Sequence, residues 1–241
     1  MKNRQLLTAN GSTCFTHPCA TAHQPLLTSN FPIFVTIMTT EKSWTQSKLN
    51  GLVLAGGDST RMGTDKGLMD YHGMPQREYL LRLLKSVTTE AYISCRPGQI
   101  EDALLPVIED HYVDMGPFGG ILSAFQFDPK AAWLVVACDF PLLDHSGIQQ
   151  LIRDRNTASI ATSFLDTHTL MPEPWITILE PGIYPLLQEY HSRGKSSLRG
   201  ILVDYTSTVI RAENPDILLN ANTPEEAEKL KQMIAMKWID H

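Results

Sequence analysis

Arg61 and Lys66 are two basic side chains in a glycine-rich segment, at a spacing that suits the binding of a phosphate. The segment begins with an apolar run, 52–54, and then breaks into small residues and a polar turn. Small residues let backbone N–H groups approach an anion, while Arg and Lys supply positive charge. A strand that opens into such a loop is typical of a phosphate-binding site.

Asp139 is the next candidate, because a carboxylate that follows an apolar strand is well placed to hold Mg²⁺. The run 133–138 is apolar throughout and predicts a central strand. Mg²⁺ is usually bound through one or two carboxylates plus substrate phosphates. A turn or helix-cap Asp is the alternative for Asp139 alone. A metal bound by Asp139, together with Arg61 and Lys66, favours phosphoryl or nucleotidyl transfer. In this chemistry the protein positions the reacting groups and neutralises their charge.

Two common nucleotide-binding motifs are absent from the sequence. The segment Gly194-Lys195-Ser196 looks like the tail of G-x-x-x-x-G-K-[ST], but Glu189 stands where the first glycine is required. G-x-G-x-x-G does not occur either, so a dinucleotide Rossmann site is not supported. Arg193, Lys195 and Arg199 are alternatively read as a loop and helix start or as cations that face a second anionic substrate.

Strands alternate with helices after the first 46 residues, which predicts one doubly wound, mostly parallel α/β sheet. Strands are expected at 52–54, 91–95, 104–108, 133–138, 159–164, 175–179, 206–211 and 217–219. Helices are expected near 75–87, 121–125, 146–155, 184–191, 197–205 and after 223. In such sheets ligands bind beyond the carboxyl ends of the strands.

Four polar segments follow predicted strands and should therefore meet at one edge of the sheet. They are 56–66, Asp110, Asp139 and 220–222. The last of them leads into Thr223-Pro224-Glu225-Glu226, whose spacing predicts a capping box at the start of the C-terminal helix.

Composition narrows the class of protein. The net charge of −6 argues against a general electrostatic grip on nucleic acid or an anionic membrane. No apolar run approaches the roughly 20 residues that span a bilayer. Cys95 and Cys138 lie in apolar, strand-like runs and are interpreted as reduced core residues. A reducing compartment, the cytoplasm, is therefore expected.

Residues 1–46 differ from the rest of the chain. They are rich in Thr, Ser, Asn, Pro and His and show no sustained period. We expect a disordered leader, or upstream sequence before a start at Met38, and a single domain over residues 47–241.

The segment from Leu54 to Lys66, LAGG-x-S-x-R-M-G-x-D-K, closely resembles the loop of nucleotidyltransferases that build molybdenum cofactor dinucleotides. Within that superfamily it is most similar to the molybdenum cofactor guanylyltransferases. Shorter matches follow in the family's order, at 107–110, 116–120, 138–141 and 220–226. The resemblance covers the chain from about Gly51 to the C-terminus and implies a Rossmann-like nucleotidyltransferase domain.

The resemblance implies that GMP is transferred from GTP to the phosphate of molybdopterin, which gives the guanine dinucleotide cofactor and pyrophosphate. Mg²⁺ is the implied cofactor, with Asp139 as its ligand. Proteins that deliver or accept the molybdenum cofactor are further implied partners.

The resemblance also assigns roles to residues. Lys66, Arg61 and Asp139 would be catalytic, and Asn220 and Asn222 would face the pterin. GTP would contact Leu54, Ala55, Gly56, Gly57, Lys66, Ser94, Asp110 and Asp139, with Asp110 at the guanine. The family often has Asn where this chain has Ser94, whose side chain is shorter and has no amide.

Two other functions remain open from the sequence. One is a cytidylyltransferase or sugar-phosphate nucleotidyltransferase on the same fold, against which Gly56, Gly57 and Asp110 favour guanine by resemblance. The other is a non-catalytic nucleotide-binding adaptor, against which the intact Lys66 and Asp139 argue.

Overall fold

The structure is a computed structural model that describes residues 47–56, 65–112 and 114–239, with side chains up to Met236. These residues belong to one compact unit, Ser43–His241. The predicted leader at 1–46, Gly57 and Arg61 lie outside the described residues.

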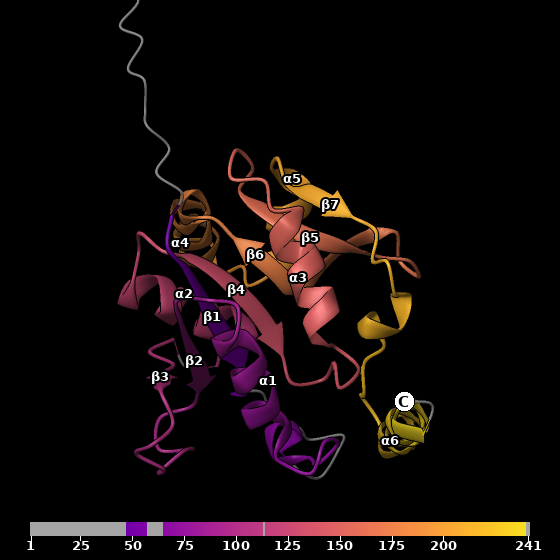
Figure 1. The fold of residues 1–241 in the computed structure, drawn as a ribbon. Coiled ribbons are helices and arrows are strands. Elements are labelled where there is room, and N and C mark those ends of the chain that lie inside the picture. Colours follow the sequence, from indigo (N-terminus) through magenta and orange to yellow (C-terminus); the bar gives the residue numbers. More distant parts are fainter. Residues whose placement is uncertain (1–46, 57–64, 113, 240–241) are drawn as a thin grey trace, which may run out of the picture. The chain divides into compact units, whose positions relative to one another are not determined.

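A seven-stranded sheet in the order β3-β2-β1-β4-β6-β5-β7 forms the centre of this unit (Figure 1). The strands β1 and β4, β1 and β2, β2 and β3, and β5 and β7 are parallel, while β6 is antiparallel to both of its neighbours. This confirms the predicted mostly parallel α/β sheet. The strands are β1 (Leu49–Leu54), β2 (Glu90–Cys95), β3 (Val107–Glu109), β4 (Ala132–Ala137), β5 (Ala161–Asp166), β6 (Met171–Leu179) and β7 (Thr208–Ile210).

The register of the central strands determines where along the sheet the segments that follow them begin. Leu54 of β1 pairs with Ser94 of β2 and with Ala137 of β4. β4 is buried along its whole length, as expected for the predicted central strand. Since the three parallel strands end at one level, the segments that start at Ala55 and Cys138 leave the sheet side by side.

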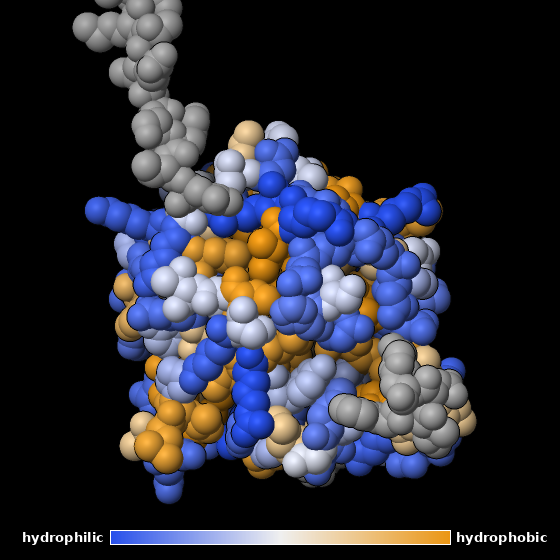
Figure 2. Space-filling view, in the orientation of Figure 1, coloured by the Kyte–Doolittle hydropathy of each residue, from blue (hydrophilic) through white to orange (hydrophobic). Residues whose placement is uncertain are grey.

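Helices cover both faces of the sheet. In Figure 1, α1 and α3 lie on the face toward the viewer, and in the layer behind α4 packs against both α2 and α5. The face drawn in Figure 2 is mostly hydrophilic, with hydrophobic residues showing between the helices. The helical segments are η1 (Lys66–Leu68), α1 (Gln76–Lys85), α2 (Pro117–Phe127), α3 (His145–Arg153), η2 (Pro181–Ile183), α4 (Tyr184–Ser192), α5 (Leu198–Asp204), η3 (Pro215–Leu218) and α6 (Pro224–Ile239).

Two hydrophobic clusters stabilise the unit. The large one lies between the sheet and its helices and contains the fully buried Trp133. Cys138 belongs to this cluster, Cys95 is also buried, and both are free thiols. The small one joins α6 to the segments that follow η1, β4 and η3, and it consists of Tyr71, Leu142, Ala221, Ala227, Leu230 and Ile234. The small cluster therefore holds the C-terminal helix beside the edge where β1 and β4 end.

The start of α6 has the predicted capping box. The Glu226 backbone N–H donates to Thr223 Oγ1 at 3.3 Å, and the Thr223 N–H donates to Glu226 Oε2 at 3.1 Å. The Asn222 N–H donates to the same carboxylate oxygen at 2.8 Å. These bonds fix the turn that carries Asn222.

The prediction of a strand at 217–219 was wrong, because Ile217 and Leu218 belong to the 3-10 helix η3 and Leu219 is its C-cap. Pro215 supplies a helical φ and no N–H, and the Asn214 side chain caps the turn by accepting from the Asp216 N–H. The strand expected at 104–108 is confined to β3. Leu104 instead stands in a turn and is 89% exposed.

Within 47–56, 65–112 and 114–239, no helix combines the length and the apolar character needed to span a bilayer.

A buried ion pair gives a test of the packing at the end of the sheet opposite the polar segments. Arg155 Nε lies 2.6 Å from Glu180 Oε1, and the two side chains are 4% and 6% exposed. We expect Glu180→Ala to lower the free energy of unfolding in urea by about 3–5 kcal/mol, because it leaves the guanidinium buried without a counter-charge. The exposed pair Arg153–Glu213, at 2.7 Å, is the matched control, and Glu213→Ala should leave stability unchanged. Equal effects of the two substitutions would contradict this account.

Candidate active site

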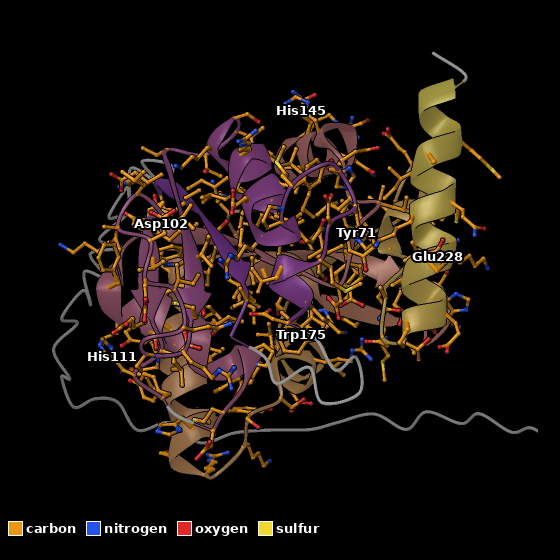
Figure 3. The ribbon with its side chains drawn as sticks, turned by 90° about the horizontal axis from the view of Figure 1, so that it is seen from below. Tyr71, Asp102, His111, His145, Trp175 and Glu228 are labelled. Carbon is orange, nitrogen blue, oxygen red and sulfur yellow. The ribbon has the colours of Figure 1, made fainter. Side chains whose placement is uncertain are left out.

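A pocket lies at the carboxyl ends of β1, β2 and β4, where three of the four polar segments meet, and the fourth, 220–222, reaches its edge through Asn222. Figure 3 looks at this edge of the sheet, with Tyr71 and α6 beside each other at one side. The pocket is lined by Leu54, Ala55, Gly56, Asp65, Lys66, Gly67, Ser94, Asp110, Gly116, Pro117, Ala137, Cys138 and Asp139. Of the predicted GTP contacts, every one that is described lies on this lining.

Lys66 stands at the centre of the contacts around this pocket. Its Nζ donates to Asn222 Oδ1 at 2.9 Å and lies 3.8 Å from Asp139 Oδ2. Lys66 opens η1, whose N-cap is Asp65, because Asp65 Oδ1 accepts from the Gly67 N–H at 2.8 Å. The ammonium is thus placed between two elements that are distant in sequence from its own.

Asp139 follows Cys138 at the end of β4, and its two carboxylate oxygens differ in their surroundings. Its Oδ1 is a buried atom that finds no hydrogen-bond partner in the described part of the chain. Burial raises the pKa of this carboxyl, and the nearby Lys66 ammonium acts against the shift. An orphaned carboxylate oxygen of this kind fits a cation, since Mg²⁺ takes oxygen ligands and needs few from the protein. No group of three His, Cys, Asp or Glu side chains that suits a metal occurs among the described residues.

The two asparagines of the 220–222 segment differ in position. The Ala221 N–H donates to the Asp139 carbonyl oxygen at 2.8 Å, which brings this segment to the end of β4. Asn222 then reaches Lys66, whereas Asn220 is exposed and its side chain makes no hydrogen bond within the described residues. The structure therefore brings Asn222 to the site and leaves Asn220 at the surface near it.

Asp110 and Ser94 form a buried pair at the other end of the pocket. Ser94 Oγ donates to Asp110 Oδ1 at 2.7 Å. Burial raises the pKa of Asp110 to about 6, although the Ser94 hydrogen bond and the neighbouring His111 lower it. The Ser94 hydroxyl, which stands where the family often has an Asn amide, thus orients the Asp110 carboxylate. Asp110 is the residue that the sequence predicts at the guanine.

Two glycines leave room for this pair. A Cβ at Gly120 would lie 2.1 Å from Ser94 Oγ, and a Cβ at Gly56 would lie 2.9 Å from Asp110 Oδ2. Both distances are too short for a real Cβ. The glycines at these positions are therefore required by the close approach of the pair rather than by backbone conformation.

The N-terminus of α2 lies at the same pocket. Gly116 precedes the helix with φ at 54°, a region that favours glycine, and Pro117 occupies its first turn. The first N–H groups of a helix carry partial positive charge. This end of α2 therefore favours a negatively charged ligand in the pocket.

Glu173 is a carboxylate near Asp139 that the sequence patterns did not single out. β6 pairs with β4 as far as Val136 and Ile176, and this antiparallel register carries Glu173 toward the end of β4. Burial raises the pKa of Glu173 to about 6, and Asp139 adds to the shift. Its place between Pro172 and Pro174 in an apolar run was the available signal, since a Glu in such a run is rarely buried without a partner.

The three cations at 193–199 already have partners in the protein. Arg193 forms an ion pair with Glu189, and the Lys195 ammonium lies 5.4 Å from the centre of the Tyr190 ring. Arg199 lies between two carboxylates, 3.6 Å from Glu173 Oε2 and 4.0 Å from Asp166 Oδ2. These contacts favour a structural role over the binding of a second anionic substrate.

Comparison with known proteins agrees with this geometry. The sequence model of the MobA-like NTP transferase domain matches residues 51–209. The molybdenum cofactor guanylyltransferase of Pseudomonas entomophila is 30% identical over 184 residues, which are 72% of this chain and 93% of that protein. A molybdenum cofactor biosynthesis bifunctional protein of Synechocystis is 32% identical over 75% of this chain. The match spans about half of that longer protein, 53%.

A solved structure shows the same fold. Molybdopterin-guanine dinucleotide biosynthesis protein A of Archaeoglobus fulgidus superposes with a TM-score of 0.67 at 19% identity. The match covers 78% of this chain and 99% of that one.

The contact between Gly120 and Ser94 can be tested by adding one methyl group. Ala normally stabilises a helix interior relative to Gly, but we expect Gly120→Ala to lower the free energy of unfolding by about 1–3 kcal/mol through overpacking. Gly182→Ala, where a Cβ would meet nothing within 4 Å, is the control. Adding Ser94→Ala to Gly120→Ala should recover stability in thermal melts. A double variant no more stable than Gly120→Ala would show that the clash lies elsewhere.

Proposed function

Because this chain belongs to the MobA-like NTP transferase family, we propose that it transfers GMP from GTP to the phosphate of molybdopterin. The products are the guanine dinucleotide form of the cofactor and pyrophosphate. The observation that carries this proposal is the meeting of Lys66, Asp139 and Asn222 beside a pocket that ends at the buried carboxylate of Asp110. The Pseudomonas entomophila relative, a molybdenum cofactor guanylyltransferase, supports it.

Asp110 is the proposed guanine contact. The guanine edge presents two adjacent N–H donors, which an ionised carboxylate accepts. Asp110 Oδ1 already accepts from Ser94, so Oδ2 and the remaining lone pairs of the carboxylate would accept from the base. The backbone of Leu54–Gly56 would contact the nucleotide between the base and Lys66. Gly57 is proposed to contact GTP and Arg61 to be catalytic, as the resemblance of the sequence implies.

Lys66 is proposed to bind the phosphates of GTP. In the reaction, an oxygen of the pterin's terminal phosphate attacks the α-phosphorus of GTP in line. A new P–O bond forms as the bond to the β-phosphate oxygen breaks, and pyrophosphate leaves with the bonding electrons. The attacking phosphate is already anionic near neutral pH, so the step needs no strong base. The main task of the protein is to hold the reactants in line and to offset charge.

Asp139 is the proposed ligand of Mg²⁺, through the oxygen that has no hydrogen-bond partner among the described residues. When bound, the ion would offset the charge of the triphosphate and of the leaving pyrophosphate. Asn222, held against Lys66, is the proposed contact of the acceptor, and Asn220 lies next to it at the surface. Proteins that supply molybdopterin or receive the product would approach this exposed edge.

The reaction can be followed as pyrophosphate release with Mg²⁺, molybdopterin and each of the four nucleoside triphosphates in turn. We expect release with GTP, and we expect Lys66→Ala and Asp139→Ala each to lower kcat/KM by about a hundredfold or more. Lys195→Ala is the matched control, because its ammonium contacts a Tyr ring away from the pocket lining. Release with CTP alone would support a cytidylyltransferase, and GTP binding without release would support an adaptor.

The raised pKa of Asp110, about 6, predicts how GTP affinity depends on pH. The ionised carboxylate that accepts the guanine N–H groups is lost as pH falls through this value. Calorimetry should therefore show that GTP binds about tenfold more weakly near pH 5 than near pH 7.5. Asp110→Asn should bind GTP weakly at both values. Tripolyphosphate, which has no base, controls for titration elsewhere in the site, and an equal loss of its affinity would remove Asp110 as the cause.

A further inference from the structure

Gln99 connects the two ends of the glycine-rich loop, and no sequence motif marks it. Its Nε2 donates to the Ala55 carbonyl oxygen at 3.0 Å and to Asp65 Oδ2 at 2.9 Å. Its Oε1 accepts from the Arg96 N–H at 3.0 Å. Both amide hydrogens and the amide oxygen are therefore used, and the two acceptors lie on either side of residues 56–64 in the sequence.

Each of the two acceptors belongs to an element of the phosphate site. The Ala55 N–H still follows the sheet ladder and donates to the Ser94 carbonyl at 2.9 Å. The Ala55 carbonyl points away from the sheet ladder, and it accepts from the Gln99 amide instead of from a neighbouring strand. Asp65 uses Oδ1 to cap η1 through Gly67, which leaves Oδ2 for Gln99.

The position of Gln99 is itself fixed by a turn anchored on β3. The Gln99 N–H donates to the Arg96 carbonyl at 3.0 Å, and Gly98 takes a positive φ of 70° that favours glycine. The Gly98 N–H donates to Glu109 Oε1 at 3.0 Å. The backbone that carries the amide is thus held by the turn and by β3.

We infer that Gln99 is a positioning residue that sets the distance between the Ala55–Gly56 backbone and Lys66, the two sides of the triphosphate site. This inference rests on the proposed binding of GTP. Gln99 is absent from the pocket lining and acts through Ala55 and Asp65. The position requires an amide, because a carboxylate of the same shape would place an oxygen against a carbonyl and against the Asp65 carboxylate.

Gln150 offers a matched control with the same chemistry in another place. Its Nε2 donates to the Arg211 carbonyl at 2.8 Å, and its Oε1 accepts from the Glu213 N–H at 2.9 Å. It joins α3 to the segment after β7 and is absent from the pocket lining. Replacing Gln150 by Glu tests what the loss of such a bridge costs in stability alone.

The test compares Gln99→Glu with Gln150→Glu by calorimetric GTP binding, by KM for GTP and for molybdopterin, and by thermal melting. Gln99→Glu should raise Kd and KM for GTP about tenfold or more, with KM for molybdopterin nearly unchanged. Gln150→Glu should lower the melting temperature and leave GTP binding as in the wild type. Equal loss of GTP affinity in the two variants would overturn the inference.

A second substitution keeps the test independent of folding. Asp65→Asn, made in the Gln99→Glu background, restores one donor–acceptor pair between the two side chains and should recover part of the GTP affinity. Recovery supports a direct contact, and its absence overturns it. If the wild-type chain binds GTP and Gln99→Glu binds it equally well, this inference fails while the proposed function stands. If the wild-type chain does not bind GTP, the proposed function fails first.

Discussion

The placement of the Lys66 ammonium between Asn222 and Asp139 is the constraint on which the site depends. A half-buried ammonium needs hydrogen-bond acceptors and a counter-charge, because leaving it without them would cost more than one such contact returns. Its partners lie on segments that follow β4 and η3, and Asn222 is 156 positions away in the sequence. The fold satisfies the ammonium by bringing the ends of distant elements to one edge of the sheet.

Two kinds of interaction hold those ends in place. The C-terminal segment is fixed by the bond from the Ala221 N–H to the Asp139 carbonyl, by the capping box of α6 and by the small hydrophobic cluster. Ala55 and Asp65 are both bonded to the Gln99 side chain, and the turn that carries Gln99 is anchored on β3 through Gly98. Opposite sides of the phosphate site are therefore supported by different parts of the sheet. A change on one side is expected to affect the nucleotide more than the acceptor, or the reverse.

Much of this arrangement could be predicted from local sequence, and the predictions that failed did so for physical reasons. An apolar run that stops at glycines or at Asp139 predicts a buried strand and a polar end, because the hydrophobic pattern and the loop chemistry agree. The run 217–219 is too short to distinguish a strand from a helical turn, and Pro215 favours the helical turn because its φ is fixed in the helical range. The side-chain partners of Ser94, Gln99 and Glu173 could not be predicted from the sequence for another reason. The roles of these residues depend on partners that only the tertiary fold brings near, as with Asp110 for Ser94 and Asp65 for Gln99.

The most direct test of the central claim is to follow which phosphorus of GTP reaches the pterin. The wild-type chain would be incubated with Mg²⁺, molybdopterin and GTP labelled with ³²P at either the α or the γ position. Transfer through the Lys66–Asp139 edge predicts that the α label enters the dinucleotide product and that the γ label leaves only as pyrophosphate. The γ label on the pterin would mean phosphoryl transfer and would contradict the account, as would the absence of any label in the product.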